Sequence, residues 1–296
     1  MKLIHIRGLN CYHDCVITLA GAFGLDYVQS FSGLWSESDL RYDPICKVFL
    51  TRRMPAALED MGMRLGPPRV TKEERERAWA QLPAGGFLLA GMDGFLIPWN
   101  PLYRLQHGPH YFIVQKTRAD PQTCLDPTYG LGGEALDSQD LVGNAYALIP
   151  VARTASGLPL AAAQDPDSLP AQAREVIGHH PAAISGFLEQ AGVWLRGTEE
   201  TVLFPAKFVD ALLANRLLYR HYLEERHPES EEAALFQDKR YYEAWQAVKH
   251  GFYKAALTKR NPSVFDEACD CLAALFQREI ALAERLLARQ QGVPRA

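Results

Sequence analysis

The sequence is poor in cysteine, with six in 296 residues, and it lacks the cysteine spacings typical of a metal site. So few cysteines do not resemble the dense disulfide framework of small secreted domains, and we expect reduced thiols. The pairs Cys11/Cys15 and Cys269/Cys271 lack the Cys-x2-Cys and His-x3-His spacing of structural zinc sites. The sequence therefore predicts neither a disulfide scaffold nor a metal ion.

The chain also lacks an excess of positive charge and a long hydrophobic run. Its 31 Lys and Arg against 35 Asp and Glu give a net charge of −4, whereas a general nucleic-acid binder needs a basic surface to meet the phosphates. The stretch 1–7 has too few apolar residues for a membrane anchor and no small-residue cleavage site. We therefore expect a cytoplasmic protein with no nucleic-acid partner and no membrane association.

What is present divides the chain into two parts. Residues 1–153 mix short helical and strand patterns with frequent Gly and Pro, whereas residues 170–296 carry apolar residues at helical spacing almost throughout. The stretch 154–170 between them is rich in turn-forming residues. We predict an α+β domain over 1–153, with a helix packed on an antiparallel sheet, and a helical bundle over 170–296.

The expected helices and strands follow from the spacing of apolar residues and from the residues typical of helix and strand ends. In the first part, helices are expected over 11–23, from near Met54-Pro55, and over 71–82, where Thr71 and Glu74 have the spacing of a capping box. Strands are expected over 86–90, 94–97, 110–115, 123–125 and 144–150. In the second part, helices are expected over 171–191, 205–226, 237–259 and 263–290.

The most informative segment is Asn10-Cys11-Tyr12-His13-Asp14-Cys15, which leads directly into an apolar run. It places Cys11 in the first turn of a helix, where free N–H groups and the helix dipole favour the thiolate that attacks carbonyl carbon. Cys15 lies one turn further along, among the apolar positions, so we expect it to be buried. Cys11 is our predicted nucleophile, and Cys15 is the alternative.

A histidine and an aspartate about a hundred residues on complete a nucleophilic site. His110 opens the apolar run 111–114, and Asp126, followed by Pro127, closes the next expected strand. A lone histidine is usually structural, and an Asp-Pro pair usually starts a turn. Paired strands would nevertheless bring the carboxylate beside the imidazole and fix its tautomer, which predicts His110 as the base and Asp126 as its orienting partner. His107 is the alternative base.

Further residues are expected around the substrate. The stretches 31–36 and 97–103 combine aromatic and turn residues, so Trp35, Trp99 and Tyr103 are candidate walls of a groove for an acyl chain, although ordinary packing explains them equally well. Cys15 is a candidate contact. Asn10 either caps the helix or helps the N–H of Cys11 to hold an oxyanion.

In their order and spacing, these residues resemble the butirosin-biosynthesis acyltransferase (BtrH-like) family, a branch of the papain-like cysteine fold related to bacteriocin-processing peptidases. The resemblance covers roughly residues 8–150. It rests on Asn10-Cys11-Tyr12-His13, Phe31-Ser32-Gly33-Leu34-Trp35, Pro98-Trp99 with Tyr103, and His110-Tyr111-Phe112-Ile113-Val114 with Asp126-Pro127. It implies Cys11 as nucleophile, His110 as base and Asp126 as orienter.

Members of that family move an aminoacyl or peptidyl group from a phosphopantetheine thioester on a carrier protein to an amine, in bacterial natural-product pathways that include nonribosomal peptide clusters. The resemblance therefore implies an acyltransferase with no cofactor of its own, an acyl or peptidyl carrier protein as partner, and a small-molecule amine as acceptor. A thioesterase, peptidase or amidase would use the same three residues. A binding protein that has kept the fold without the reaction is the third interpretation.

Overall fold

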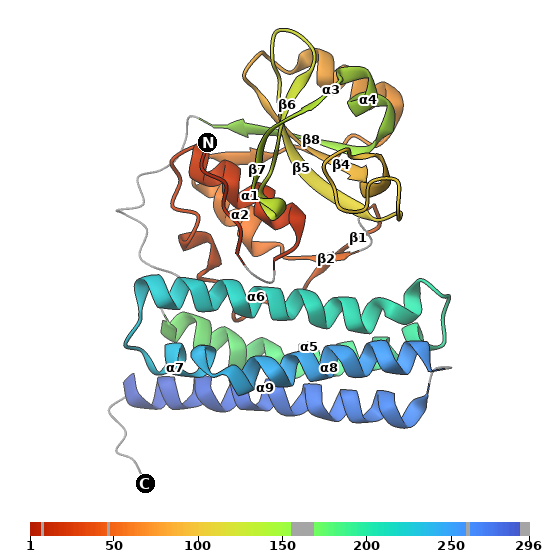
Figure 1. The fold of residues 1–296 in the computed structure, drawn as a ribbon. Helices are drawn as coiled ribbons and strands as arrows, with labels where there is room; N and C mark the ends of the chain where they lie inside the picture. Colours follow the sequence, from red (N-terminus) through yellow and green to blue (C-terminus); the bar gives the residue numbers. More distant parts are fainter. Residues whose placement is uncertain (7–8, 46–47, 155–168, 259–260, 291–296) are drawn as a thin grey trace. The chain divides into compact units, whose positions relative to one another are not determined.

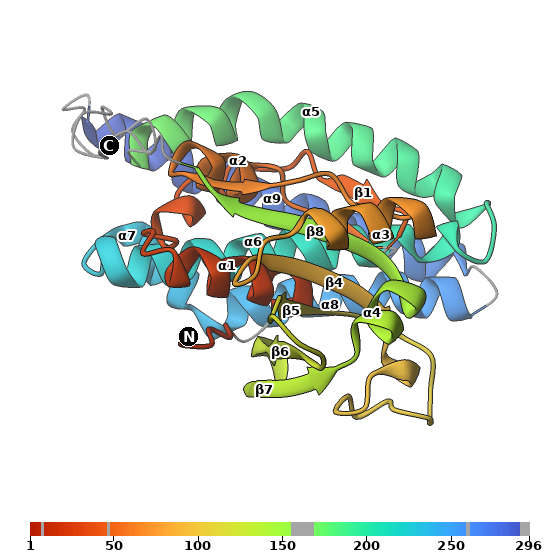
Figure 2. The ribbon, with the colours of Figure 1, turned by 90° about the horizontal axis from the view of Figure 1, so that it is seen from above.

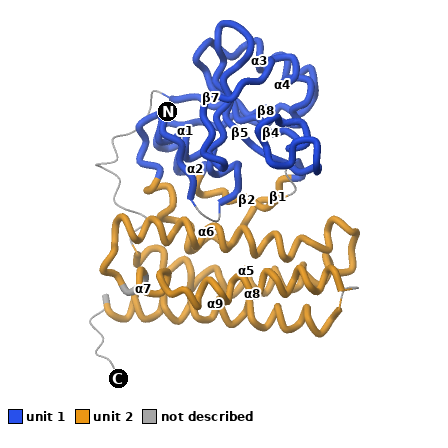
Figure 3. Tube along the Cα trace, in the orientation of Figure 1, with its two compact units in different colours: residues 1–27, 44–47, 55–160 blue, residues 28–43, 48–54, 161–296 orange. Residues whose placement is uncertain are grey.

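The computed structural model of the protein describes residues 1–6, 9–45, 48–154, 169–258 and 261–290 (Figure 1). The fold is mixed, with a six-stranded antiparallel sheet and a C-terminal helical region. It divides into two compact units, coloured separately in Figure 3. The sheet unit comprises residues 1–27, 44–47 and 55–160; the helical unit comprises residues 28–43, 48–54 and 161–296.

The sheet unit is built on strands in the order β3-β8-β4-β5-β6-β7, each antiparallel to its neighbours. Figure 2 shows this succession from β8 across to β7. The strands are β3 (Met63–Leu65), β4 (Phe87–Asp93), β5 (Pro109–Gln115), β6 (Gln122–Asp126), β7 (Leu131–Leu136) and β8 (Ala145–Arg153). Successive side chains of a strand point to opposite faces of the sheet. Five consecutive residues of β4 and of β5 are buried, so both faces of the sheet are covered by other parts of the chain.

Helices provide these covers. The helices that begin in the first part are α1 (Cys11–Ala22), α2 (Arg53–Asp60), α3 (Lys72–Gln81) and α4 (Ser138–Asn144). On one face, Leu88 of β4 and Phe112 of β5 belong to a buried cluster against which Trp79 of α3 packs. Helix α1 lies against β4 and β5. The Thr71–Glu74 capping box is confirmed, with both reciprocal hydrogen bonds present.

One expected strand is wrong. Residues 94–97 do not extend β4, because Gly94–Leu96 form a short 3-10 turn, η2. The carboxylate of Asp93 accepts the N–H groups of Phe95 at 3.1 Å and Gly108 at 3.0 Å, which ends the strand and ties the following loop. Strands β3 and β7 and helix α4 were not expected. Their short or glycine-containing sequences give little periodicity of their own.

The helical unit contains the four long helices that the periodicity predicts. They are α5 (Leu169–Leu195), α6 (Phe204–Arg226), α8 (Lys239–Leu257) and α9 (Pro262–Gln290), with the short α7 (Glu231–Gln237) between two of them. Figure 1 shows the long helices as extended rods, and α9 contacts both α5 and α8. The unit also holds a two-stranded sheet of β1 (Arg41–Asp43) and β2 (Val48–Leu50).

The two units do not coincide with the predicted domains 1–153 and 170–296, because two segments of the first part belong to the helical unit. Residues 28–43 and 48–54 belong with the helices, because their side chains are built into the helical core. The ring of Trp35 stacks on Tyr219 at 5.8 Å, and the carboxylate of Glu37 accepts a hydrogen bond from Asn215 at 3.0 Å. Most of the turn-rich stretch 154–170 falls on residues 155–168, outside the described residues.

Within the described ranges, every helix is too short or too polar to qualify as a transmembrane span.

Candidate active site

Cys11 is the first residue of α1 and is half-buried. The side chain of Asn10 caps this helix, since its Oδ1 accepts the N–H of His13 at 3.0 Å. The structure therefore places the sulfur at a helix N-terminus, where unpaired N–H groups and the helix dipole favour negative charge. The capping role expected for Asn10 is confirmed.

Strand β5 brings two groups to the sulfur. The backbone N–H of Tyr111 donates a hydrogen bond to Cys11 Sγ at 3.3 Å. His110, the residue before it, has Nε2 at 2.7 Å from Asp126 Oδ2 and also forms a hydrogen bond with Cys11. Because Nε2 is used by Asp126, Nδ1 is the nitrogen available to the sulfur. The three residues singled out from the sequence thus lie together in one hydrogen-bonded row.

The environment of His110 favours its protonated form. Burial by itself lowers the pKa of His110, but the hydrogen bonds and negative charges of Asp126 and Cys11 outweigh burial and raise that pKa to about 9. At neutral pH the ring therefore carries a positive charge beside Asp126 and Cys11. This is the charge state that a cysteine nucleophile needs, because the imidazolium stabilises the attacking sulfur and holds a proton for the leaving group.

Asp126 is fully buried and accepts a second hydrogen bond. Trp99 Nε1 donates to Asp126 Oδ2 at 3.0 Å, and the indole packs edge-on against Phe112 at 5.2 Å. The sequence suggested Trp99 as a wall for substrate. In the structure its polar edge holds the carboxylate that orients His110, so its contact with the site runs through Asp126.

A second set of contacts ties α1 to the turn after Asp126. Asp14 is fully buried, and its Oδ2 accepts hydrogen bonds from Thr128 Oγ1 at 2.8 Å and from His5 Nδ1 at 2.9 Å. Burial raises the pKa of Asp14 in spite of these hydrogen bonds, which lower it. Because Thr128 lies in the 3-10 turn η3 (Pro127–Tyr129), this carboxylate links the helix of the nucleophile to the strand end of Asp126.

Two tyrosines enclose His110. Tyr129 of η3 stacks on the imidazole with ring centroids 5.2 Å apart and an interplanar angle of 28°. Tyr146 of β8 donates its hydroxyl proton to the backbone carbonyl of His110 at 3.3 Å. A Cβ at Gly91 would lie 2.4 Å from the ring of Tyr146, so glycine is required at that position for the tyrosine to pass over β4.

The remaining predicted residues lie elsewhere or face inward. Cys15 has no exposed surface, and burial raises the pKa of its thiol well above the usual range. Trp35 also has no exposed surface, and it belongs to the helical unit. Tyr103 is half-buried in the loop after η2, with the Arg104 guanidinium 5.0 Å from the centre of its ring.

The two other histidines near the motif do not join the row. His107 is exposed, and its Nδ1 lies 2.6 Å from Asp93 Oδ2. His13 is buried, burial lowers its pKa to about 4, and neither of its ring nitrogens has a partner among the described residues. His110 is therefore the base candidate that the geometry favours.

The supporting residues were not found from the sequence. Thr128 and Tyr129 follow directly after Asp126-Pro127, so their nearness to the site could have been anticipated once Asp126 was singled out. Tyr146 had no such signal, since it reaches His110 only through the pairing of β8 with β4 and of β4 with β5.

Over the part of the chain that the structure describes, no group of three or more His, Cys, Asp or Glu side chains is arranged to hold a metal ion. Comparison with protein-family models and with curated proteins gave no match. The geometry of Cys11, His110 and Asp126 is therefore the main evidence for what this site does.

Proposed function

We propose that this protein is a cysteine acyltransferase with a papain-like catalytic unit. In this proposal it takes an aminoacyl or peptidyl group from the phosphopantetheine thioester of a carrier protein and passes it to a small-molecule amine, in a cytoplasmic natural-product pathway. The observation that carries the chemistry is His110 held between Asp126 and Cys11 at a helix N-terminus. The carrier protein and the amine rest on the family resemblance of the motifs.

The first step is acylation of the enzyme. The Cys11 thiolate attacks the thioester carbonyl, and the resulting oxyanion lies at the start of α1, where backbone N–H groups are available. The C–S bond to the pantetheine arm then breaks. The departing sulfur takes the proton from Nδ1 of His110, which leaves a free pantetheine thiol, a neutral imidazole and an acyl group on Cys11.

The second step transfers the acyl group. An amine attacks the acyl-Cys11 carbonyl while the neutral imidazole of His110 accepts the proton that the amine loses. The bond between carbon and Sγ breaks, an amide forms, and the thiolate and imidazolium are restored. Asp126 keeps Nε2 protonated throughout, so that Nδ1 is the nitrogen that exchanges protons with the substrate. Water in place of the amine would give hydrolysis by the same steps.

Intact-mass spectrometry tests the proposal directly. After incubation with an aminoacyl thioester, on a carrier protein or on N-acetylcysteamine, the protein should gain the mass of the acyl group. Cys11→Ala should gain none, whereas the buried Cys15→Ala should behave like the parent. Added amines should then remove the acyl group as an amide. The same free acid with and without amines would identify a hydrolase, and no adduct on a correctly folded parent would contradict the proposal.

A further inference from the structure

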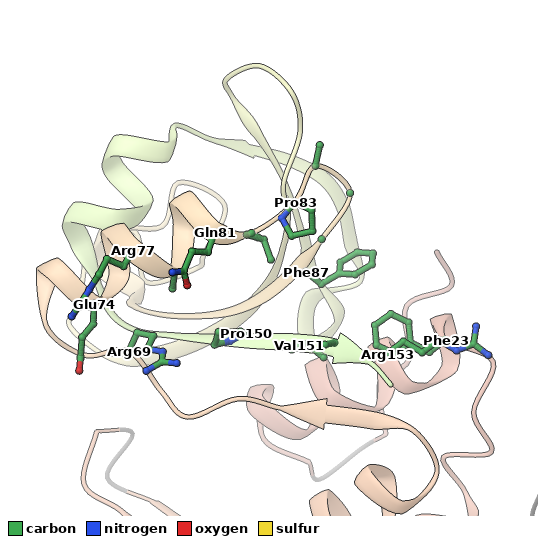
Figure 4. Close-up of a pocket in the computed structure, with 16 residues that line it drawn as sticks. Phe23, Arg69, Glu74, Arg77, Gln81, Pro83, Phe87, Pro150, Val151 and Arg153 are labelled. Atoms are coloured by element: carbon green, nitrogen blue, oxygen red, sulfur yellow. The ribbon is translucent and has the colours of Figure 1, made fainter. Parts of the chain in front are cut away.

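A cavity of about 710 Å³ lies in the sheet unit, away from the catalytic row (Figure 4). It is lined by one side of α3 along the length of that helix, by the loop that follows α3 and by the last residues of β8. In β4, Phe87 lines the cavity, whereas Met92 pairs with His110. The cavity and the catalytic row are therefore at opposite ends of the same strands. Its volume lies in the range of about 300–1,000 Å³ found for small-molecule sites.

Three arginines line this cavity against a single carboxylate. They are Arg69, Arg77 and Arg153, and the acid is Glu74. This is a local excess of positive charge in a chain whose net charge is −4. Among the described residues, none of the three guanidinium groups takes part in an ion pair within 4.0 Å.

The carboxylate of Glu74 is already engaged by the backbone. It accepts the N–H groups of Thr71 and Val70, each at 3.1 Å, and these hydrogen bonds lower the pKa of Glu74. The carboxylate therefore stays charged and compensates only part of the positive charge of its surroundings. The cavity keeps an excess of donors suited to carboxylate or phosphate oxygens.

The charges are separated along the cavity. Figure 4 shows Arg69 and Arg77 near Glu74 at one end, and Arg153 beside Phe23 at the other. Arg69 pairs with Leu148 of β8, and Arg153 is five residues further along that strand. At a rise of about 3.3 Å per residue, the two backbone positions are roughly 17 Å apart. The lining between the two ends is largely apolar; it includes Leu82, Pro83, Phe87, Pro150 and Val151.

We propose that this cavity binds a small molecule that has an anionic group at each end of an apolar body. Arg69 and Arg77 would hold one anionic group, Arg153 would hold the other, and the apolar lining would cover the part between them. A monoanion would satisfy only one end and leave the opposite guanidinium unpaired. The proposal concerns a second site and does not depend on the chemistry of Cys11.

Isothermal titration calorimetry on the full chain tests this proposal with α,ω-dicarboxylates of increasing length: glutarate, suberate and sebacate. Octanoate supplies the same apolar body with one charge, and inorganic pyrophosphate supplies charge without an apolar body. We expect one of the two longer dicarboxylates to bind about tenfold or more tightly than glutarate or octanoate, since each end makes its own charge-assisted hydrogen bonds.

Single variants locate the binding. Arg69→Gln and Arg153→Gln should each weaken the preferred dicarboxylate about tenfold, whereas Arg118→Gln, an exposed arginine of the same unit outside the cavity lining, should not change it. No binding of any dicarboxylate, equal binding at all chain lengths, or binding unaffected by both cavity variants would each overturn the proposal. The rate of Cys11 alkylation in each variant shows whether the sheet unit is still folded. Because the cavity and Cys11 are separate sites, a failed binding test leaves the acyltransferase proposal standing.

Discussion

At the residue scale, one imidazole serves two neighbours. His110 uses Nε2 for Asp126 and has Nδ1 left for Cys11, and Trp99 fixes the carboxylate from the other side. The protonation of this ring decides both how reactive the sulfur is and whether a leaving group can receive a proton.

Iodoacetamide should distinguish the cysteines at pH 6. A cationic imidazole and a helix N-terminus beside a sulfur make a cysteine more reactive toward electrophiles, and Cys11 has both neighbours. We expect Cys11 to be alkylated about tenfold or more faster than the exposed Cys271, and the buried Cys15 to react least. Peptide mass spectrometry over a time course gives the three rates. Equal rates at Cys11 and Cys271 would contradict the expectation that His110 and the helix N-terminus activate the sulfur of Cys11.

Acyl transfer should fall as the pH rises through about 9. The pKa of His110 is raised to about 9 from its ordinary 6.5, so above that pH the ring no longer holds the proton for the departing thiol. Asp126→Asn removes a charge that raises the pKa, so its alkaline decline should begin at lower pH. Single-turnover acylation rates between pH 6 and 10 measure the alkaline decline of the parent and of Asp126→Asn. If both proteins lost activity over the same pH range, the role of Asp126 would be contradicted.

The same pKa shift affects stability. Because His110 has a higher pKa when folded than when unfolded, its protonated form stabilises the fold fully below about pH 6.5, and this contribution is lost as the pH rises through about 9. Denaturant unfolding should therefore show a larger difference between the parent and Asp126→Asn at pH 6 than at pH 10.

At the element scale, two features position Cys11 and His110: the N-terminus of α1, and Tyr146, whose ring passes over β4. Asn10→Ala removes the cap and should lower the free energy of unfolding by about 1 kcal/mol, and it should also slow alkylation of Cys11. Ser230 caps α7 in the same way, by accepting the N–H of Ala233 at 3.1 Å. Ser230→Ala is thus a matched control that should leave the Cys11 rate unchanged.

Gly91 and Tyr146 permit a sharper comparison. Tyr146→Phe removes the hydrogen bond to the His110 carbonyl, which is worth about 1 kcal/mol, and should reduce Cys11 alkylation a few-fold. Gly91→Ala should reduce it further, because its Cβ would displace the Tyr146 ring. At Gly143 a Cβ meets nothing within 4 Å, so Gly143→Ala is the control. An unchanged alkylation rate in Gly91→Ala would contradict this positioning role.

Local signals predicted some elements and missed others. The long helices have apolar residues at helical spacing, α1 begins at a capping Asn10, and β5 is an apolar run, so local sequence predicts these elements. Residues 94–97 are apolar enough for a strand, but the carboxylate of Asp93 turns the chain there. Cys11, His110 and Asp126 were found because each stands beside a local pattern. Tyr146 reaches the site only through strand pairing, and Trp35 gives no sign of which core it joins.

At the scale of the whole molecule, the helical unit depends on a buried charged cluster. Glu279 is fully buried and accepts hydrogen bonds from Arg216 at 2.9 and 3.1 Å, from His180 at 3.1 Å and from the Tyr241 hydroxyl. Burial raises the pKa of Glu279, but the Arg216 charge and the hydrogen bonds outweigh it and bring the pKa to about 2. A pair this deeply buried leaves an uncompensated charge when one partner is removed.

Glu279→Gln should therefore lower the free energy of unfolding by about 3–5 kcal/mol. Glu224→Gln is the control, because its pair with Arg220 is partly exposed and lies one helical turn apart on α6, where such pairs contribute about 0.5 kcal/mol. Urea denaturation followed by circular dichroism measures both. A loss below about 1 kcal/mol in Glu279→Gln would show that the cluster contributes little.

The placement of residues 28–43 and 48–54 has a consequence for biosynthesis. As the nascent chain leaves the ribosome, Trp35 and Glu37 emerge long before Tyr219 and Asn215, with which they pack and bond. An amino-terminal fragment that stops near residue 154 would contain Trp35 and Glu37 but would lack the helical residues that pack on and bond to them. We therefore expect such a fragment to aggregate when expressed alone and to become soluble when the missing helices are supplied as a separate polypeptide.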